Sequence, residues 1–144
     1  MSWLRQVRDK IINTSPEILA RIATEVAMHY VMLARELIME EIRMTEFSDA
    51  PSRQRCLYAC ATLDEARYWN QRIGENGTIC ELKCSGTIHQ ADARLLLGDS
   101  EPLSVTRARA RAYWRGEVGE NPEMETLFVG DVKVTGFPRG TEFD

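Results

Sequence analysis

The sequence predicts an α+β fold, in which a small, largely antiparallel sheet is combined with a long N-terminal helix and two shorter helices that pack on the sheet. Three observations lead to this prediction. An unbroken helical periodicity begins at Pro16, three short strand-like runs follow it, and two further helical stretches separate those runs. Short strands mixed with helices in a chain of 144 residues are typical of one α+β domain with a core of its own.

The N-terminal part is expected to be helical. Residues 2–12 have the spacing of a short amphipathic helix. A second helix begins with Ser15 as its N-cap and Pro16 at its first position, and apolar side chains then recur at helical spacing to about Met44. This helix is long compared with the mean of about 11–12 residues. We therefore expect part of it to extend beyond the sheet or to pack on a second copy of the chain.

The middle of the chain is predicted to turn sharply from a strand into a helix. Residues 55–60 form a short apolar run, which favours a strand inside the sheet rather than at its edge. Thr62 and Glu65 have the spacing of a capping box, which starts a helix. One side of that helix carries Leu63, Ala66, Trp69, Asn70 and Ile73.

The remainder contains two more strands and one more helix. We predict a turn at 74–77, a half-buried strand at 78–85, an irregular segment at 86–102, a helix at 104–115 and a last strand at 125–134. The prediction is a single domain, 1–144, made of a helical part (1–46), a sheet region (47–135) and a loose tail (136–144).

Composition excludes several classes of function. The chain has 18 basic and 22 acidic residues, so its net charge of −4 argues against a general affinity for nucleic acid or anionic membranes. No apolar run approaches the roughly 20 residues that span a bilayer. The N-terminus lacks the apolar core of a signal peptide, which predicts a cytoplasmic protein with reduced cysteines.

Two groups of residues suggest metal or acid–base chemistry. Cys56, Cys60, Cys80 and Cys84 lie in predicted strands, where residues four apart are about 13 Å from each other. We therefore expect small buried hydrophobic residues and no metal. His89 and Asp92 suit a metal pair or an acid–base pair, but one histidine in a loop is weak evidence for either.

A stripe of arginines is open to two interpretations. Arg107, Arg111 and Arg115 are four apart on a predicted helix, with Trp114 on the same side. Arginine beside an indole can hold a phosphate or stack on a base, but such a stripe is more often a solvated face.

Two carboxylates stand where the last strand begins. Glu123 and Glu125 are two residues apart, so on a strand their side chains project to the same face. Such a pair can raise the pKa of one member or bind a sugar hydroxyl, and it is also found at solvated strand ends.

Several of these residues also form motifs that resemble an uncharacterised bacterial domain family. The similarity covers roughly residues 40–135. It rests on Glu41-x-Arg43, Pro51-Ser52-Arg53, Cys56-Leu57-Tyr58-Ala59, Glu65-Ala66, Trp69, His89-x-x-Asp92, Ala110-x-x-Tyr113-Trp114-x-Gly116 and Glu125-x-Leu127. The block in turn resembles the split-sheet fold of the ADP-ribosyltransferases, which bind NAD in a cleft.

That second resemblance implies a set of roles. It implies NAD as the substrate, a strand-to-helix corner beneath the nicotinamide at Tyr58 and Thr62, and Glu125, with Glu123 before it, as the catalytic carboxylates. The first-strand arginine or histidine of such enzymes has no obvious counterpart; among Arg5, Arg43 and Arg53, Arg53 is best placed to anchor a phosphate or ribose. Tyr113 completes the expected cofactor-binding residues, and no metal is expected.

The resulting hypothesis is an ADP-ribosyltransferase-like protein that modifies a protein or nucleic-acid acceptor, as a toxin or effector would. The alternative is a non-enzymatic interaction module that forms a homodimer or binds a partner through the long apolar helix. A third hypothesis is an RNA-binding module built on the arginine stripe and Trp114, which the acidic net charge disfavours. None of the three requires a membrane.

Overall fold

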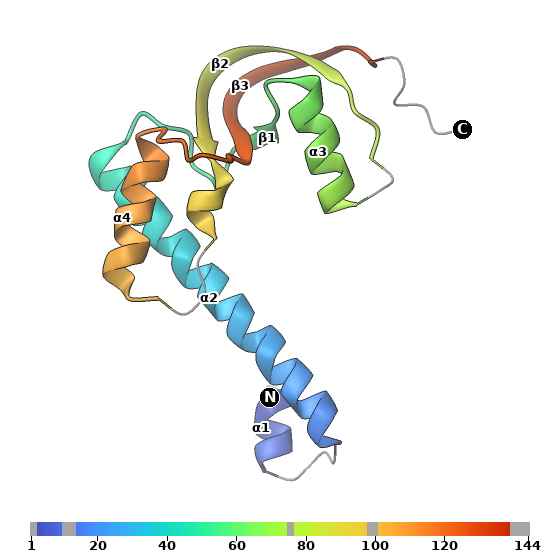
Figure 1. Cartoon of the computed structure of the whole chain (residues 1–144), viewed down its shortest axis with the longest axis vertical. Coiled ribbons are helices and arrows are strands. Elements are labelled where there is room, and N and C mark those ends of the chain that lie inside the picture. The colour runs from blue at the N-terminus through green and yellow to red at the C-terminus, as the bar shows by residue number, and fades with distance from the viewer. Residues whose placement is uncertain (1–2, 10–13, 75–76, 98–100, 139–144) are drawn as a thin grey trace. The chain divides into compact units, whose positions relative to one another are not determined.

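A computed structural model of the chain describes residues 3–9, 14–74, 77–97 and 101–138. The chain divides into two compact units, Met1–Leu37 and Ile38–Asp144, and the division falls inside the long helix. The predicted α+β fold is confirmed: helices and a three-stranded antiparallel sheet are both present (Figure 1).

The described part of the first unit is helical. Helix α1 (Trp3–Arg8) precedes α2 (Pro16–Glu46), of which the part up to Leu37 belongs to this unit. The predicted start of α2 is confirmed, and the Ser15 hydroxyl accepts a hydrogen bond from the backbone N–H of Ile18 at 3.3 Å. None of the residues whose burial is described in this unit is buried. Its exposed apolar side chains are Ile18, Leu19, Met28, Tyr30, Met32, Leu33 and Leu37.

The second unit holds the sheet. After the last turns of α2 come β1 (Leu57–Ala59), α3 (Leu63–Ile73), β2 (Glu81–Asp92), the short 3-10 helix η1 (Ala93–Leu96), α4 (Leu103–Trp114) and β3 (Met124–Gly136). The strand order is β1-β3-β2, and both pairings are antiparallel. The last strand in sequence is therefore the central strand of the sheet.

The first strand differs from its prediction. It covers residues 57–59 instead of 55–60 and lies at an edge of the sheet, with β3 as its partner. Its side chains explain the error, because Leu57 and Tyr58 are 41% and 48% exposed. The corner that follows is as predicted: the capping box of Thr62 and Glu65 starts α3. One residue of the predicted apolar side of α3, Ile73 at the end of the helix, is exposed.

The second strand is longer than predicted. The segment expected to be irregular from Gly86 continues as strand to Asp92, because β3 pairs with it over its whole length. Only a partner 32 to 55 positions further along the chain, such as Met124 for Asp92 and Gly136 for Glu81, reveals this extension. The helix predicted at 104–115 is found as α4, shifted by one residue at each end.

The cysteines are more exposed than expected. All four are free thiols; Cys56 and Cys60 are half-buried, whereas Cys80 and Cys84 are exposed. The prediction of buried hydrophobic cysteines is therefore wrong for the second pair. The reason is that Cys80 precedes β2, and Cys84 lies in the part of β2 that contributes no residue to the core.

The β2–β3 ribbon is strongly curved (Figure 1), and two glycines face each other within it. Gly86 is paired with Gly130, which has a φ of +149°. A Cβ atom on Gly130 would lie 2.4 Å from the Ser85 carbonyl oxygen and 2.7 Å from the Gly86 Cα. Only glycine allows this close approach and this backbone conformation. Helix α3 lies on the concave side of the bend (Figure 1).

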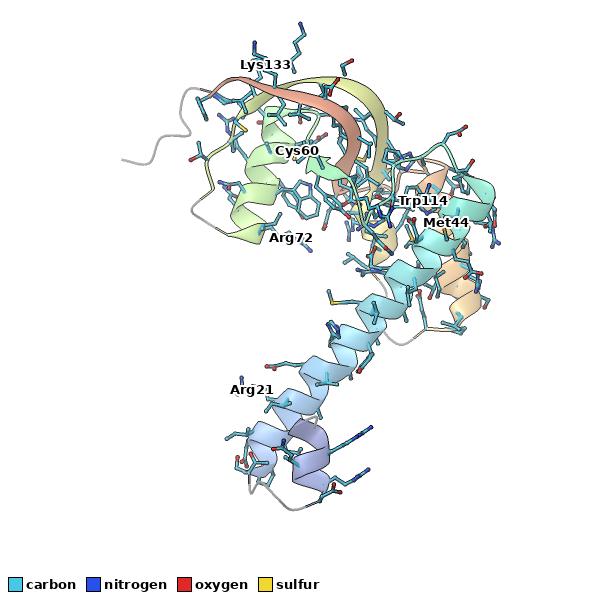
Figure 2. The ribbon with its side chains drawn as sticks, turned by 180° about the vertical axis from the view of Figure 1, so that it is seen from behind. Arg21, Met44, Cys60, Arg72, Trp114 and Lys133 are labelled. Carbon is cyan, nitrogen blue, oxygen red and sulfur yellow. The ribbon has the colours of Figure 1, made fainter. Side chains whose placement is uncertain are left out.

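The core of this unit lies where the end of α2, η1 and α4 meet one end of the sheet, the end at which β2 finishes and β3 begins. Trp114 is 3% exposed, and its indole N–H donates to the Met39 carbonyl at 2.9 Å (Figure 2). The other buried hydrophobic residues of this core are Ile38, Met39, Ile42, Ala91, Ala93, Leu96, Ala110, Tyr113 and Leu127. The core therefore supports one end of the sheet, where β2 ends and β3 begins.

Candidate functional site

A clamp on the last turns of α2 fixes the loop that carries Arg53. Glu40 accepts hydrogen bonds from Arg43, at 3.0 and 2.9 Å, and from the Ser52 hydroxyl at 3.0 Å. Arg43 also donates to the carbonyls of Ser48 and Ala50. The hydrogen bond from Arg43 lowers the pKa of Glu40, so the clamp is ionised at neutral pH. Because this clamp holds Ser52, it sets the position of the next residue in the loop, Arg53.

Arg53 belongs to a buried cluster with Tyr113 and Glu125. Its Nη1 forms an ion pair with Glu125 Oε1 and donates to the Tyr113 hydroxyl oxygen at 2.6 Å. The Tyr113 hydroxyl donates to the same Oε1 at 2.5 Å. The Arg53 and Glu125 side chains are only 9% and 11% exposed. The loop, α4 and β3 thus bring one cation, one phenol and one carboxylate to a common point.

Tyr58 forms the exposed border of this cluster. The Arg53 guanidinium carbon lies 5.5 Å from the ring centre of Tyr58 and 5.1 Å from that of Tyr113. The Tyr58 hydroxyl donates to the Arg53 carbonyl at 2.9 Å. Because Tyr58 is 48% exposed, one part of its ring holds the arginine while another faces solvent.

Strand register places a histidine on the same face. Tyr58 is opposite Leu127, and His89 is opposite Leu127 on the other side. Glu125 is two residues before Leu127, so all three side chains project from one face of the sheet. His89 Nε2 is 3.2 Å from the Tyr113 carbonyl oxygen. The site therefore has an imidazole at its inner border, which the sequence interpretation had placed in a loop.

Burial sets the protonation of two of these groups. It raises the pKa of Tyr113 well above its ordinary value; the nearby Glu125 charge acts in the same direction, and Arg53 opposes it. Tyr113 therefore keeps its proton and acts as a donor to Glu125. Burial also lowers the pKa of His89, which favours the neutral imidazole at neutral pH.

Two of the predicted site residues lie elsewhere. The Thr62 hydroxyl accepts from the backbone N–H of Glu65 at 3.2 Å, so it serves as the cap of α3. Glu123 precedes β3, and its Oε1 accepts from Arg72 Nη1 at 3.2 Å. Glu123 and Glu125 are thus held by different arginines, whereas Arg53, Tyr58, Tyr113 and Glu125 come together.

Glu123 lines a separate open cleft of about 620 Å³. Tyr68 and Trp69 of α3 also line this cleft, and their rings meet edge to face at 5.4 Å between centres. The Trp69 indole N–H donates to the Met124 carbonyl at 2.7 Å, which ties α3 to the start of β3. The remaining lining residues are Asp64, Glu65, Arg94, Glu120, Asn121, Pro122 and Met124.

His89 and Asp92 do not form the pair that their spacing suggested. Three positions apart on β2, they project to opposite faces. Asp92 is 2% exposed and accepts from the backbone N–H groups of Arg94, Gly119 and Glu123 at 3.0, 3.1 and 2.9 Å. Asp92 therefore has a structural role: it closes the turn into η1 and holds the loop before β3.

Two arginines of the stripe on α4 also have structural roles, because they form ion pairs with α2. Arg107 pairs with Glu41 at 2.9 Å, and Arg111 pairs with Glu46 at 2.8 Å. Trp114 is in the core and does not share the surface of the arginines. The expectation that Trp114 lies on the same side as the arginines is therefore wrong, and the stripe is a partly exposed, ion-paired face, the interpretation that such a pattern favours.

Sequence reasoning did not single out Glu40, which reaches the site only through its bonds to Arg43 and Ser52. It did single out His89, but only the extension of β2 places that residue beside Tyr113. The motifs Glu41-x-Arg43 and Pro51-Ser52-Arg53 were a signal for the clamp, since they contain two of its members, Arg43 and Ser52. Within the described ranges, no group of three or more His, Cys, Asp or Glu side chains is arranged to hold a metal ion. None of the described helices has the length and hydropathy needed to cross a membrane.

The fold and the cluster define a class: an α+β domain that carries a buried Arg–Tyr–Glu cluster on one face of a three-stranded antiparallel sheet. The chain belongs to the family described as "Protein of unknown function (DUF2441)", whose model matches residues 4–140. This confirms the predicted resemblance to an uncharacterised family, over a longer stretch than expected. A comparison with curated proteins found no match. The resemblance to ADP-ribosyltransferases stays a prediction.

Proposed function

We propose that the protein binds NAD and transfers ADP-ribose, with Glu125 as the catalytic carboxylate. The observation that carries the proposal is the cluster itself: Glu125 is held by Arg53 and Tyr113 beside the half-exposed ring of Tyr58. These four residues come from segments up to 72 positions apart, and the resemblance had assigned all of them to one site.

The cluster suits the chemistry at the nicotinamide–ribose bond. Breaking this bond builds positive charge on the ribose, and a fixed carboxylate stabilises that charge in the transition state. Arg53 and Tyr113 both bind Oε1 of Glu125, which leaves the other oxygen, Oε2, to face the ribose. Tyr58 provides a ring face for the nicotinamide as it leaves.

The residues fit the reactive end of NAD. The site has an aromatic ring, a guanidinium and a carboxylate within one cluster. Arg53 forms an ion pair with Glu125, so its main role in this proposal is to position the carboxylate. A phosphate or ribose of NAD binds the same guanidinium. Thr62 is occupied with capping α3 and takes no part.

The test is NAD binding by calorimetry with the full chain, followed by mass spectrometry for released or transferred ADP-ribose. In Glu125→Gln, turnover should fall by about 10²–10³, with NAD affinity nearly unchanged, because the charge is needed mainly in the transition state. Glu123→Gln is the matched control, since Arg72 and not Arg53 holds that carboxylate. Absence of NAD binding in the wild type contradicts the proposal, and full activity in Glu125→Gln removes this residue from catalysis.

A second candidate function rests on the surface of α2. Among the described residues of Met1–Leu37, exposed apolar side chains such as Tyr30 (63%) and Leu37 (58%) follow the helix without a core of their own. A helix of this kind is stabilised mainly by packing its apolar side against a partner. In this candidate function, the protein dimerises or binds another protein through α2. Leu33→Glu should then abolish the association while NAD binding stays unchanged, as measured by light scattering and calorimetry.

A further inference from the structure

We propose that the outer edge of β2 is an interface at which two copies of the chain pair their β2 strands in antiparallel orientation, centred on Leu82. The result is one continuous six-stranded sheet with a two-fold axis at its middle. This inference concerns a different surface from the NAD site and does not depend on the proposed function.

The first observation is that β2 lies at the edge of the sheet without a second partner. Among the described residues, β2 pairs only with β3, and no backbone hydrogen bond leaves it for any other segment. Exposed edges usually carry proline, a bulge or charged side chains, especially lysine. The charges of β2 near its start are one of each sign, Glu81 and Lys83, so they repel a second copy only in some registers. From Gly77 to Asp92 the chain has no proline, and the extra residue of its one register shift, Thr135, belongs to β3. The edge is thus open to pairing.

The second observation is an apolar row that ends at this edge. Leu82 is opposite Val134, and Cys84 is opposite Val132; the two valines are 51% and 43% exposed. Pairing at Leu82 places the Leu82 side chains of the two copies side by side. Four aliphatic side chains, Val134 and Leu82 from each copy, then form one row across the joined sheet, which buries apolar surface that one copy leaves in water.

The third observation is a repulsive pair that the second copy neutralises. Lys83 is directly opposite Lys133, and among the described residues neither has an ion-pair partner. Lys133 points away from the ribbon on the side opposite α3 (Figure 2). Like charges directly opposite each other destabilise a sheet. Pairing centred on Leu82 puts Glu81 of the second copy directly opposite Lys83, on the same face as both lysines.

The charges select this register over its neighbours. A centre at Lys83 would place two copies of Lys83 against each other, and a centre at Cys84 would place Lys83 opposite Ser85. Only a centre at Leu82 opposes Glu81 and Lys83, and the symmetry makes this contact twice. Because only residues near 79–85 take part, the interface is small, and we expect a weak dimer that dissociates in the micromolar range or above.

Sedimentation velocity of the full chain over a range of concentrations tests the pairing. We expect a monomer–dimer equilibrium that weakens as salt is added, since exposed charge pairs are screened. Glu81→Lys and Lys83→Glu should each raise the dissociation constant by about tenfold or more, the equivalent of about 1.4 kcal/mol. The double variant Glu81→Lys/Lys83→Glu restores opposite charges between the copies and should return the constant to near the wild-type value.

The control is Glu120→Lys, which reverses an exposed charge outside β2 and should leave the equilibrium unchanged. Circular dichroism checks that each variant stays folded. A chain that remains monomeric at every concentration overturns the proposal. So does a dimer that ignores both single reversals, which is the result expected if association runs through α2, or a double variant that fails to recover.

Discussion

Tyr113 donates a 2.5 Å hydrogen bond to Oε1 of Glu125, and the same oxygen forms the ion pair with Arg53. The phenol belongs to the buried end of α4, and the carboxylate belongs to the central strand. A buried carboxylate is tolerated only when it is paired and hydrogen-bonded, and here one cation and one neutral donor meet that requirement. The arrangement holds the carboxylate in one position.

The first prediction concerns that hydrogen bond. Tyr113→Phe keeps the ring in the core but removes the donor, so we expect the free energy of unfolding to fall by about 1.5–3 kcal/mol, the range for hydrogen bonds to charged groups. Urea unfolding measures this loss. Tyr30→Phe, on the exposed part of α2, is the control and should be neutral. Equal stability of Tyr113→Phe and wild type would show that the hydroxyl contributes nothing.

The raised pKa of Tyr113 also predicts an alkaline effect. The folded chain holds this proton more tightly than the unfolded chain, so the contribution is full below the ordinary tyrosine pKa of about 10 and is lost as the pH rises above it. Stability measured between pH 9 and about pH 11 should fall less steeply in Tyr113→Phe than in wild type. Identical slopes would contradict the burial of this phenol.

The second prediction concerns His89, whose pKa is lowered by burial. The unfolded chain binds the proton more readily, so stability is full above the ordinary histidine pKa of about 6.5 and is lost as the pH falls through the folded value. Urea unfolding at pH 7.5 and about pH 5.5 should show this loss in wild type and much less of it in His89→Gln. His29→Gln is the control and should keep the loss of stability at low pH. If His29→Gln removes this loss and His89→Gln does not, the prediction is wrong.

The third prediction concerns Asp92, which holds three backbone N–H groups. Asp92→Ala leaves these donors without their charged acceptor, and we expect a loss of about 3 kcal/mol or more in the free energy of unfolding. Asp64→Ala removes an exposed carboxylate that pairs with Arg67, and it should cost less than about 1 kcal/mol. Comparable losses for the two variants would exclude a special role for the turn at Asp92.

The fourth prediction concerns the bend in the β2–β3 ribbon. Gly130→Ala places a Cβ atom against the opposite backbone at a positive φ, a backbone conformation that costs about 1–3 kcal/mol for other residues. Thermal unfolding should therefore show a clear loss of stability. Gly136→Ala, on the same strand, meets only an ordinary contact of 3.5 Å to Glu81 and should be tolerated. A stable Gly130→Ala variant would mean that the ribbon can straighten at no cost.

Local signals in the sequence determined the helices. The Ser15-Pro16 start, the Thr62 capping box and the periodicity of α4 all predicted boundaries that the structure confirms to within one or two residues. Each of these signals acts between residues at most four positions apart. A chain segment can satisfy such a signal by itself, so its sequence is sufficient to predict the result.

Strand order and the site depended on partners far along the chain. Nothing within residues 55–60 reveals that this segment pairs with β3 at an edge of the sheet, and nothing near Gly86 reveals pairing with Gly130. The sequence, through its resemblance to a family, did select Arg53, Tyr58, Tyr113 and Glu125. Only the tertiary structure separated these four residues from Thr62 and Glu123, because hydrogen bonds between distant segments decide which side chains share one oxygen and which serve as a cap or bind another arginine.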